Sequence, residues 1–256
     1  MPMADNVLVE RRGGVLTITL NRPEVKNALD YAVAEGIAAA VDNLDADDSL
    51  HVGILTGAGG TFSSGMDLKA YLRGEAPTID GRGLAGITEA PPRKPLIAAV
   101  EGWALAGGFE LMLACDLVVA SQRARFGVPE VKRSLVALGG GALQLPRRIP
   151  AAAALEMLLT GDPIDAERAM ALGLVNRVAP EGEALAAALN LANKIAANGP
   201  LAVAATKAIA RQAADWALDE GWTKQLQIGG PVFESEDSRE GALAFAEKRQ
   251  PVWKGR

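Results

Sequence analysis

Two carboxyl groups and a glycine pair lie close together between residues 101 and 130. Gly107 and Gly108 open an apolar run, Glu110 stands inside that run, and Glu130 follows twenty residues later, directly after a proline. The first turn of a helix carries peptide N–H groups without a partner inside the helix, and the helix dipole adds partial positive charge there. A helix that starts at Gly107 could therefore stabilise a developing oxyanion, with two carboxyl groups nearby to move protons.

A second glycine turn offers another peptide N–H group. Residues 52–56 form a buried-strand candidate, and the glycine-rich segment 57–65 leads from that strand to Met66 and a helix. Two turns that each follow a buried strand and open a helix can place one N–H apiece on a shared carbonyl oxygen. Tight packing is the competing explanation for these glycines, and for either turn alone both explanations stay open.

Segment 56–63 also invites comparison with a dinucleotide-binding turn, because it is rich in glycine and follows a strand. Thr61 and Ser63 stand where a short-chain dehydrogenase would have glycine, and no Tyr-x-x-x-Lys pair follows. The G-x-G-x-x-G pattern and the lysine of a phosphate-binding loop are also missing. A nucleotide-binding fold is therefore disfavoured.

Composition excludes several other kinds of site. The chain of 256 residues has one histidine, His51, and one cysteine, Cys115. An internal disulfide is therefore impossible, and a histidine-rich metal site or a Ser-His-Asp triad is disfavoured. No metal-ligand spacing such as CxxC or HExxH occurs, so we expect no metal site. The apolar neighbours of Cys115 predict a core residue, and the net charge of −5 argues against nucleic acid as the main partner.

Residues 1–6 contain neither a basic segment nor an apolar stretch of the kind found in secretory leaders. No uninterrupted apolar run approaches the roughly 20 residues of a membrane helix. We therefore expect no membrane span and a cytoplasmic location.

The elements that must position these groups alternate between strands and helices over the first 150 residues. We expect a hairpin over 7–20, and a helix capped by Asp30, with apolar residues at helical spacing. Buried strands are expected at 52–56, 96–100 and 117–120. This alternation predicts an α/β fold with largely parallel pairing.

The later part of the chain is mostly helical. Alanine-rich helices are expected at 151–160, 166–171, 184–197, 201–213 and 238–248. One strand is expected at 174–178, and the Gly-Gly-Pro sequence at 229–231 is expected to separate helices. Residues 73–93, rich in glycine, proline and charge, are expected to form a mobile loop.

Five motifs, in order along the chain, resemble the crotonase family of enoyl-CoA hydratases and isomerases, with enoyl-CoA hydratases as the nearest match. They occupy residues 19–29, 62–69, 105–116, 125–130 and 245–249. The resemblance implies a spiral core domain of ββα turns over residues 1–199 and a helical C-terminal trimerisation region over residues 200–256. It also implies a homotrimer or a hexamer built as a dimer of trimers, and an acyl-CoA thioester substrate.

The same resemblance implies roles for particular residues. The peptide N–H groups of Met66 and Gly107 would bind the thioester oxygen, and Glu110 and Glu130 match the two acids that hydratases of this family use. Phe245 and Lys248 would close a CoA site, in this chain or in a neighbouring subunit. The full set implied to line CoA is Val25, Lys26, Met66, Asp67, Leu68, Lys69, Gly107, Phe245 and Lys248. No separate cofactor is expected, because coenzyme A enters as part of the substrate.

The chemistry that fits these groups is addition of water to a 2-enoyl thioester, which gives a 3-hydroxyacyl thioester. Glu110 is assigned as the base toward water and Glu130 as the acid toward Cα. The alternatives are a Δ3,Δ2-enoyl-CoA isomerase, which can work with one glutamate, and a non-catalytic CoA-binding assembly protein. Retention of both glutamates and both oxyanion turns favours the hydratase.

Several positions depart from the usual family pattern. Ala106 replaces the first glycine of a triplet, which we expect to be a mild change, and Ser134 stands where glycine is common. Phe109 is a bulky residue beside the catalytic turn, and segment 73–93 is expected to border the acyl chain. These departures leave the identity of the acyl group open.

Overall fold

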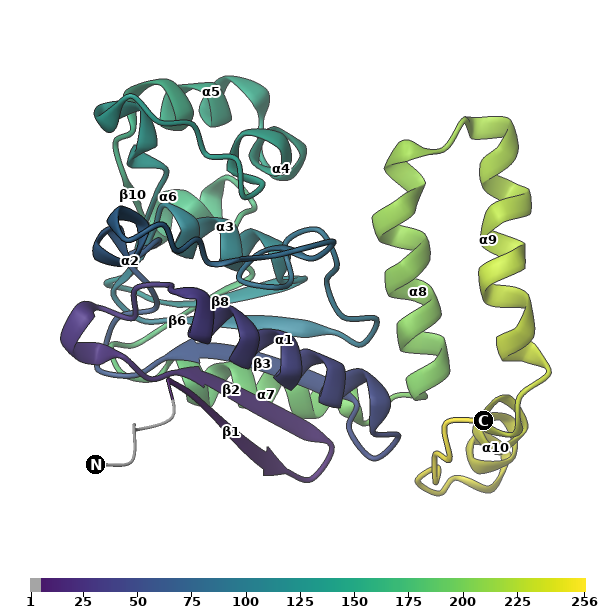
Figure 1. Ribbon diagram of the computed structural model, residues 1–256. Coiled ribbons are helices and arrows are strands. Elements are labelled where there is room, and N and C mark those ends of the chain that lie inside the picture. Colours follow the sequence, from purple (N-terminus) through teal and green to yellow (C-terminus); the bar gives the residue numbers. More distant parts are fainter. Residues whose placement is uncertain (1–5) are drawn as a thin grey trace.

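A six-stranded sheet forms the centre of the computed structural model, which describes residues 6–256 (Figure 1). Residues 1–5, on which the expectation about the N-terminal leader largely rests, lie outside the described part. In spatial order the strands are β1 (Val7–Arg12), β2 (Val15–Leu20), β3 (Val52–Gly57), β6 (Leu96–Val100), β8 (Leu117–Ser121) and β11 (Arg177–Ala179). Only the β1–β2 hairpin is antiparallel, and every other neighbouring pair in this sheet is parallel. The prediction of an α/β fold with largely parallel pairing is confirmed.

Helices cover both faces of this sheet. One face packs with α1 (Tyr31–Ala46) and α3 (Gly107–Ala114) in the main hydrophobic core, and the other packs against α7 (Ala184–Ala196). Asp30 caps α1 as predicted, because its side chain accepts a hydrogen bond from Val33 N. The central strands β3 and β6 are buried on both faces and nearly continuously apolar, and the one hydroxyl, that of Thr56 in β3, donates to Ala99 O of β6.

A second, smaller sheet turns two strands of the large sheet, β6 and β8, into the first strands of ββα-type turns. It contains β10 (Ile164–Asp165), β9 (Arg125–Gly127) and β7 (Trp103–Leu105) in that order. β6 is followed by β7 and α3, while β8 is followed by β9 and the 3-10 helix η2 (Pro129–Arg133). An earlier turn follows the same plan, since β3 leads to an isolated bridge between Ser63 and Ala104 and then to α2 (Leu68–Leu72). The predicted spiral of ββα turns is confirmed.

Segment 73–93 is more ordered than expected. It contains a two-stranded sheet, β4 (Thr78–Ile79) and β5 (Gly83–Leu84), and Ala85 and Ile87 are fully buried in the main core. Two apolar anchors among many glycines and prolines give no periodic pattern, which is why the sequence indicated a mobile loop.

Two of the expected alanine-rich helices, α5 (Ala151–Thr160) and α6 (Ala166–Ala171), have the predicted bounds. A further helix, α4 (Gly141–Arg148), begins at the last of three consecutive glycines, residues 139–141. The remaining 3-10 helices are η1 (Pro23–Val25) and η3 (Ala213–Asp215). The strand expected at 174–178 is displaced, because β11 begins only at Arg177.

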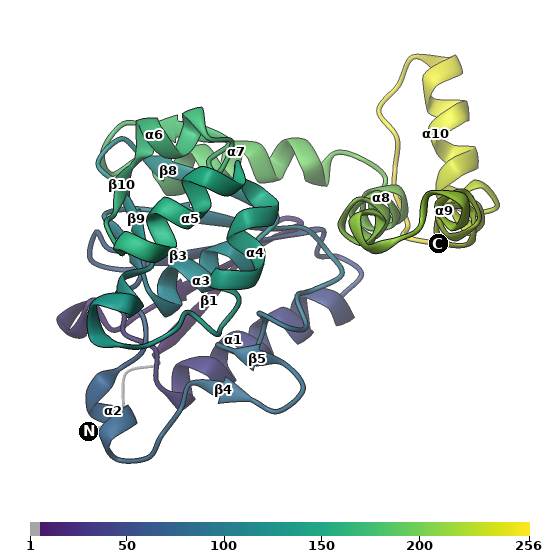
Figure 2. The ribbon, with the colours of Figure 1, turned by 90° about the horizontal axis from the view of Figure 1, so that it is seen from above.

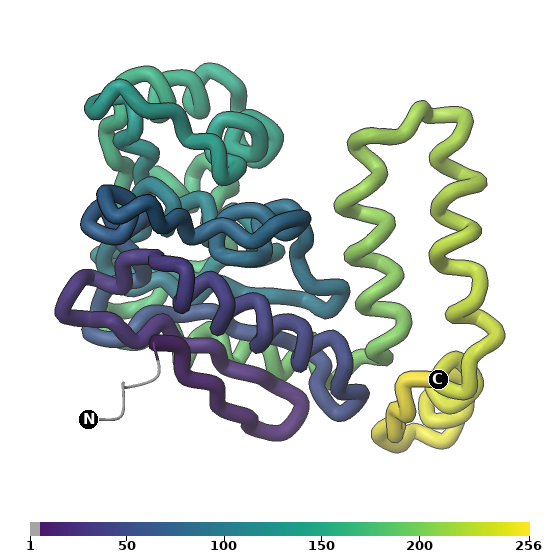
Figure 3. The backbone as a smooth tube through the Cα atoms, viewed as in Figure 1, coloured from purple at the N-terminus to yellow at the C-terminus, as the bar shows by residue number. Residues whose placement is uncertain are grey.

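The chain after residue 199 forms three helices beside the core. α8 (Pro200–Gln212) and α9 (Leu218–Phe233) run antiparallel, and α10 (Glu236–Glu247) lies across their end (Figures 2 and 3). The predicted break at residues 229–231 is wrong, since α9 continues to Phe233 with Pro231 in its last turn. A Cβ at Gly229 would lie 3.6 Å from Ile209 Cδ1, an ordinary packing distance, so α9 packs against α8 at this position. The division into two domains stays a prediction, as does the trimerisation role of residues 200–256.

No helix between residues 6 and 256 has both the length and the hydropathy required to span a membrane.

Candidate active site

The register of two short parallel strands brings the two glutamates together. Leu105 at the end of β7 pairs with Gly127 at the end of β9, so both strands end at the same edge of the small sheet. α3, which carries Glu110, starts two residues after β7, and η2, which carries Glu130, starts two residues after β9. The carboxyl ends of parallel strands are where α/β folds commonly bind ligands.

The first residue of α3 presents a free peptide N–H. The carbonyl of Ala106 accepts a hydrogen bond from Glu110 N at 3.0 Å, so it points along the helix. In a trans peptide the C=O and the following N–H point in opposite directions. The Gly107 N–H therefore points out of the helix start, and it donates to no other group within residues 6–256.

The Met66 N–H is oriented by the same geometry. Gly65 O accepts a hydrogen bond from Leu29 N at 2.8 Å, so the N–H of the same peptide, that of Met66, points away from Leu29. A Cβ at Gly107 would lie 3.5 Å from Met66 N, and one at Gly65 would lie 2.9 Å from Gly107 N. Like the Gly107 N–H, the Met66 N–H donates to no group in the described chain. Two free donors therefore lie side by side, as an oxyanion hole requires.

Close backbone contacts explain the glycines of this region. A Cβ at Gly108 would lie 2.5 Å from Ser63 O, and Gly65 has φ of +93°. Ala106 has φ of +49° and ψ of −127°, a conformation that favours glycine and costs a larger residue about 1–3 kcal/mol. The replacement of glycine by Ala106 is therefore not the mild change that the sequence suggested. Ser134 also lies in the left-handed region, at φ of +56°.

Two glycines of the run 139–141, Gly139 and Gly141, lie against the Glu110 carboxyl group. Its Oε1 accepts a hydrogen bond from Gly141 N at 2.9 Å. A Cβ at Gly139 would lie 2.7 Å from Oε2 and one at Gly141 would lie 3.1 Å from Oε1, so side chains at either position would crowd the carboxylate. The glycine cluster at the start of α4 therefore forms a cradle for a catalytic-type acid.

The two glutamates share a raised pKa but differ in their partners. Burial, opposed by the Gly141 N–H and reinforced by the charge of Glu130, raises the pKa of Glu110 to about 7. Burial also raises the pKa of Glu130, against the opposing effects of its own peptide N–H and of Arg133. Glu130 Oε2 is buried and has no hydrogen-bond partner in the described chain. Carboxyl groups in such surroundings can exchange protons near neutral pH.

A cavity of about 880 Å³ reaches Glu110 and opens between the core and α8. Its lining includes Gly139, Gln144 and Lys207. Leu84 belongs to the segment expected to border the acyl chain, and it lies close to Gly107 and to Gly139. Its Cδ2 would lie 3.2 Å from a Cβ at Gly107 and 2.5 Å from one at Gly139. Phe109, noted in the sequence as a bulky residue beside the catalytic turn, is fully buried in the main core.

The residues expected to line CoA fall into two separate groups. Val25 and Lys26 end η1, Leu68 and Lys69 begin α2, and all four are exposed on either side of Met66. Ser64 N donates to Lys26 O at 3.0 Å, which ties these two segments together. Phe245 and Lys248 lie instead at the end of α10, far from α2 (Figure 2). One chain therefore does not bring them to the site, and their role toward a neighbouring subunit stays a prediction.

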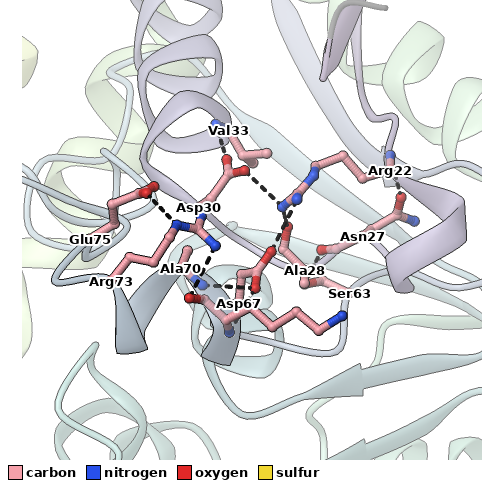
Figure 4. Close-up of polar contacts among 11 residues, drawn as sticks. Arg22, Asn27, Ala28, Asp30, Val33, Ser63, Asp67, Ala70, Arg73 and Glu75 are labelled. Atoms are coloured by element: carbon pink, nitrogen blue, oxygen red, sulfur yellow. Dashed lines mark hydrogen bonds and ion pairs between the residues drawn. The ribbon is translucent and has the colours of Figure 1, made fainter.

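Arg22 forms an ion-pair network beside Met66 to which the sequence assigned no role (Figure 4). Its guanidinium contacts Asp30 Oδ2 and Asp67 Oδ2, each at 3.0 Å. Asp67, expected to line CoA, instead directs its carboxyl group to Arg22 and to the N–H groups of Lys69 and Ala70 at the start of α2. The only signal was the presence of Arg22 in the first motif.

A second network, also unassigned from sequence, joins α8 to the far end of α3. Asp116 forms ion pairs with Lys207 at 2.6 Å and with Arg211 at 3.0 Å. Arg211 also donates to Ala114 O, and Arg148 donates to the carbonyls of residues 113 and 115. Guanidinium groups thus satisfy the last carbonyls of α3, where the helix dipole favours positive charge.

Comparison with known proteins defines the class to which this fold and site correspond. The sequence matches the profile of the enoyl-CoA hydratase/isomerase family over residues 10–256, and the chain belongs to this family.

Individual relatives share nearly their full length with it. A carnitinyl-CoA dehydratase of Salmonella enteritidis PT4 is 43% identical, over 99% of this chain and 100% of the relative. An enoyl-CoA hydratase structure from Mycobacterium tuberculosis H37Rv superposes with a TM-score of 0.97 at 58% identity, and one from Mycobacterium marinum with 0.97 at 60%. Each covers 99% of this chain and 100% of the other.

Residues 6–256 contain no cluster of three or more His, Cys, Asp or Glu side chains arranged to hold a metal ion.

Proposed function

We propose that this protein is an enoyl-CoA hydratase, which adds water across the double bond of a 2-enoyl-CoA and gives a 3-hydroxyacyl-CoA. The observation that carries the proposal is that proton-transfer groups and oxyanion donors lie close together at one edge of the small sheet. Two glutamates with raised pKa, Glu110 and Glu130, lie near the free peptide N–H groups of Met66 and Gly107. Hydration of an enoyl thioester requires both kinds of group.

The reaction begins with the thioester carbonyl between the two N–H groups. The Glu110 carboxylate takes a proton from water while the water oxygen bonds to C3. The electrons of the C2–C3 double bond move toward the carbonyl, and the resulting oxyanion accepts hydrogen bonds from Met66 N and Gly107 N. Glu130 gives its proton to C2 as the carbonyl re-forms. Return of the proton from Glu110 to Glu130 by way of solvent restores the starting pair, and one water has been added.

The different surroundings of the two glutamates support this division of labour. Glu110 accepts a peptide N–H, which stabilises a carboxylate and suits a base. Glu130 Oε2 has no donor within the described residues, which favours the protonated form and suits an acid. Because the charge of one affects the pKa of the other, the apparent values belong to the pair.

The relatives support a hydro-lyase rather than another activity of the family. Two superposed structures bear the name enoyl-CoA hydratase, and the Salmonella relative bears the name carnitinyl-CoA dehydratase. Both names describe addition or removal of water. We extend this chemistry to the present chain and expect no cofactor apart from the CoA carried by the substrate.

The C-terminal helices support the further proposal that the chain assembles with copies of itself, as a trimer or a hexamer. Large apolar side chains on these helices are exposed in a single chain: Leu218, Trp222, Leu226, Phe233 and Phe245. Apolar surface on this scale is typical of an interface. A cytoplasmic location also stays a prediction.

The decisive experiment follows loss of the conjugated enoyl-thioester absorbance, with crotonyl-CoA and with a longer 2-enoyl-CoA. We expect the absorbance to fall and, in D₂O, the 3-hydroxyacyl product to carry one deuterium at C2. An isomerase would move the double bond of a 3-enoyl-CoA without consuming water. No change with either 2-enoyl substrate would refute the hydratase proposal.

A further inference from the structure

The Met66 N–H lies between two backbone hydrogen bonds to Leu29. On one side Gly65 O accepts from Leu29 N, and on the other Asp67 N donates to Leu29 O, both at 2.8 Å. Leu29 thus holds the residues before and after Met66, while the Met66 N–H itself stays free. Before Met66 the turn is also held by Ser64 N, which donates to Lys26 O at 3.0 Å. After Met66, the side chain of Asp67 provides a further contact that helps to fix the orientation of the turn.

Arg22 is the partner of the Asp67 side chain. Its guanidinium bonds to Asp67 Oδ2 at 3.0 Å, to Asp30 Oδ2 at 3.0 Å and to Ala28 O at 2.7 Å (Figure 4). The planar fork therefore joins the turn that carries Met66 to the residues on both sides of Leu29. A lysine ammonium group, with a single nitrogen, cannot hold two carboxylates and a carbonyl in the same fixed geometry.

Both carboxylates that Arg22 joins are helix caps. Asp30 accepts from Val33 N at the start of α1, and Asp67 accepts from Lys69 N and Ala70 N at the start of α2. The side chains of Arg22, Asp30 and Asp67 are only 16%, 16% and 13% exposed, so water competes weakly for these bonds. Burial alone raises the pKa of Asp67, but the Ala70 N–H and the Arg22 guanidinium bring it below its usual range.

The position of Arg22 is itself fixed by Asn27. Arg22 N donates to Asn27 Oδ1 at 2.9 Å, and Asn27 N donates to Arg22 O at 2.8 Å. Asn27 Nδ2 donates to Ala58 O and Thr61 O, at the two ends of the glycine turn after β3. The guanidinium therefore extends from a loop anchored to the main sheet.

We infer that Arg22 is a positioning residue for the oxyanion hole, which fixes the Met66 N–H on the thioester oxygen by tying Asp67 to Asp30 and Ala28. This inference rests on the proposed function for its thioester. Arg22 acts through Asp67 and the backbone and touches no reacting atom. Its loss lets the turn rotate about Leu29 and moves one of the two donors, while the glutamates and the Gly107 donor stay in place.

The expected effect is on turnover rather than on binding. Loss of one oxyanion donor costs about 100- to 1,000-fold in kcat, and a displaced donor costs part of this. We expect Arg22→Met to lower kcat by about 100-fold, with KM changed only a few-fold. Arg22→Lys keeps the charge and loses the fork, so we expect it to recover only a small part of the rate.

The direct test is the carbonyl stretch of bound butyryl-CoA labelled with ¹³C at the thioester carbon, measured by difference infrared spectroscopy. This saturated ester cannot be hydrated, so the reading is independent of turnover. Donors on the oxygen lower the stretching frequency. We expect a clear downshift in the wild-type protein, and a much smaller one in Arg22→Met and in Asp67→Asn at saturating ligand.

Two features of the design keep the test decisive. Asp67→Asn retains an oxygen for the Lys69 and Ala70 N–H groups, and with Arg22→Lys it serves if Arg22→Met does not fold. Arg11→Met is the matched control, because it removes an arginine–aspartate ion pair with Asp47 on the surface of β1, and its downshift should equal that of wild type. A full downshift in the Arg22 and Asp67 variants would overturn the inference and leave the hydratase proposal intact. No downshift in the wild-type protein would overturn the oxyanion hole itself.

Discussion

Helix α3 and the hairpin of α8 and α9 differ in how far their residues are buried within one chain. All eight residues of α3, Gly107–Ala114, are buried, whereas none of the residues of α8 or α9 is buried. α3 has its N-terminal donors, its carboxyl group and its last carbonyls in defined surroundings within one chain. α9 presents Trp222, Leu226 and Phe233 to solvent.

This contrast distinguishes a candidate site that a single chain assembles from an apolar surface that a single chain leaves exposed. The two peptide N–H groups and the two glutamates to which we assign the chemistry all lie within residues 6–199 of one chain. The exposed apolar side chains of α9, by contrast, gain stability only when another surface covers them, at about 25 cal/mol for each Å² buried.

The largest expected effect is on catalysis in the core. We predict that Glu110→Gln and Glu130→Gln each reduce turnover by at least ~100-fold, because each removes one proton-transfer group. Affinity for butyryl-CoA, measured by calorimetry, should stay close to wild type. Glu10→Gln, a change at an exposed glutamate on β1, is the control. Full turnover in either active-site variant would refute the paired-acid mechanism.

The next effect is confined to the C-terminal helices. We predict that Trp222→Glu combined with Phe233→Glu converts the assembly into single chains of 26.6 kDa, because a carboxylate cannot be buried in an apolar contact without a large cost. Light scattering coupled to size-exclusion chromatography measures the mass. A matched double change to Gln at the exposed Glu10 and Glu24 should leave the mass unchanged. An unaltered assembly in the Trp222 and Phe233 variant would place the interface elsewhere.

A smaller effect concerns stability and pH in the core. Burial raises the pKa of Glu110 from 4.5 to about 7, so the folded protein holds this proton more tightly than the unfolded chain does. The resulting stability is fully present below pH 4.5 and is lost as the pH rises through 7. Glu110→Gln escapes this loss. We therefore predict that its free energy of unfolding, relative to that of wild type, is about 3 kcal/mol higher at pH 8 than at pH 4.5.

Denaturant unfolding at the two pH values measures this difference, and Glu10→Gln again serves as the control. A stability difference that is the same at pH 4.5 and pH 8 would show that Glu110 does not carry a raised pKa.

The smallest effect concerns the CoA surface. Lys26→Ala and Lys69→Ala should each weaken butyryl-CoA binding only about three- to fivefold, since exposed charge pairs contribute about 1 kcal/mol or less. The weakening should shrink at high salt, because ions screen exposed charges. Calorimetric titration at two ionic strengths, with the distant Lys224→Ala as the control, checks this. A loss of affinity that does not depend on salt would exclude an electrostatic role.

Much of the architecture could be predicted from the sequence because long apolar strands and alanine-rich helices give strong periodic patterns. The strands β7 and β9 were not predicted, since three residues are too few to show alternation. The register between β7 and β9 places Glu110 and Glu130 at the same edge of the small sheet. The proximity of these two glutamates was predicted only from the resemblance to a family.

The environment of each site residue was harder to predict than its position. Glu110 and the glycines at 139–141 are about thirty residues apart in the sequence, so the cradle and the raised pKa appear only after folding. Arg22 and Asp67 are separated by 45 positions and pair for the same reason. The glycines at 229 and 230 misled in the opposite direction, because contact between α8 and α9 outweighed their low helix propensity.

The guanidinium groups at the end of α3 have a mechanical consequence. α3 is eight residues long, so about 12 Å separates its first peptide N–H from its last carbonyls. Arg211 of α8 donates to one of those carbonyls, and the free Gly107 N–H lies at the other end. Helix α3 is thus a short rod between the C-terminal hairpin and the proposed oxyanion donor. We expect substitutions that shift α8 to shift this N–H as well, so that a change in how the hairpin packs would be measured as a change in turnover.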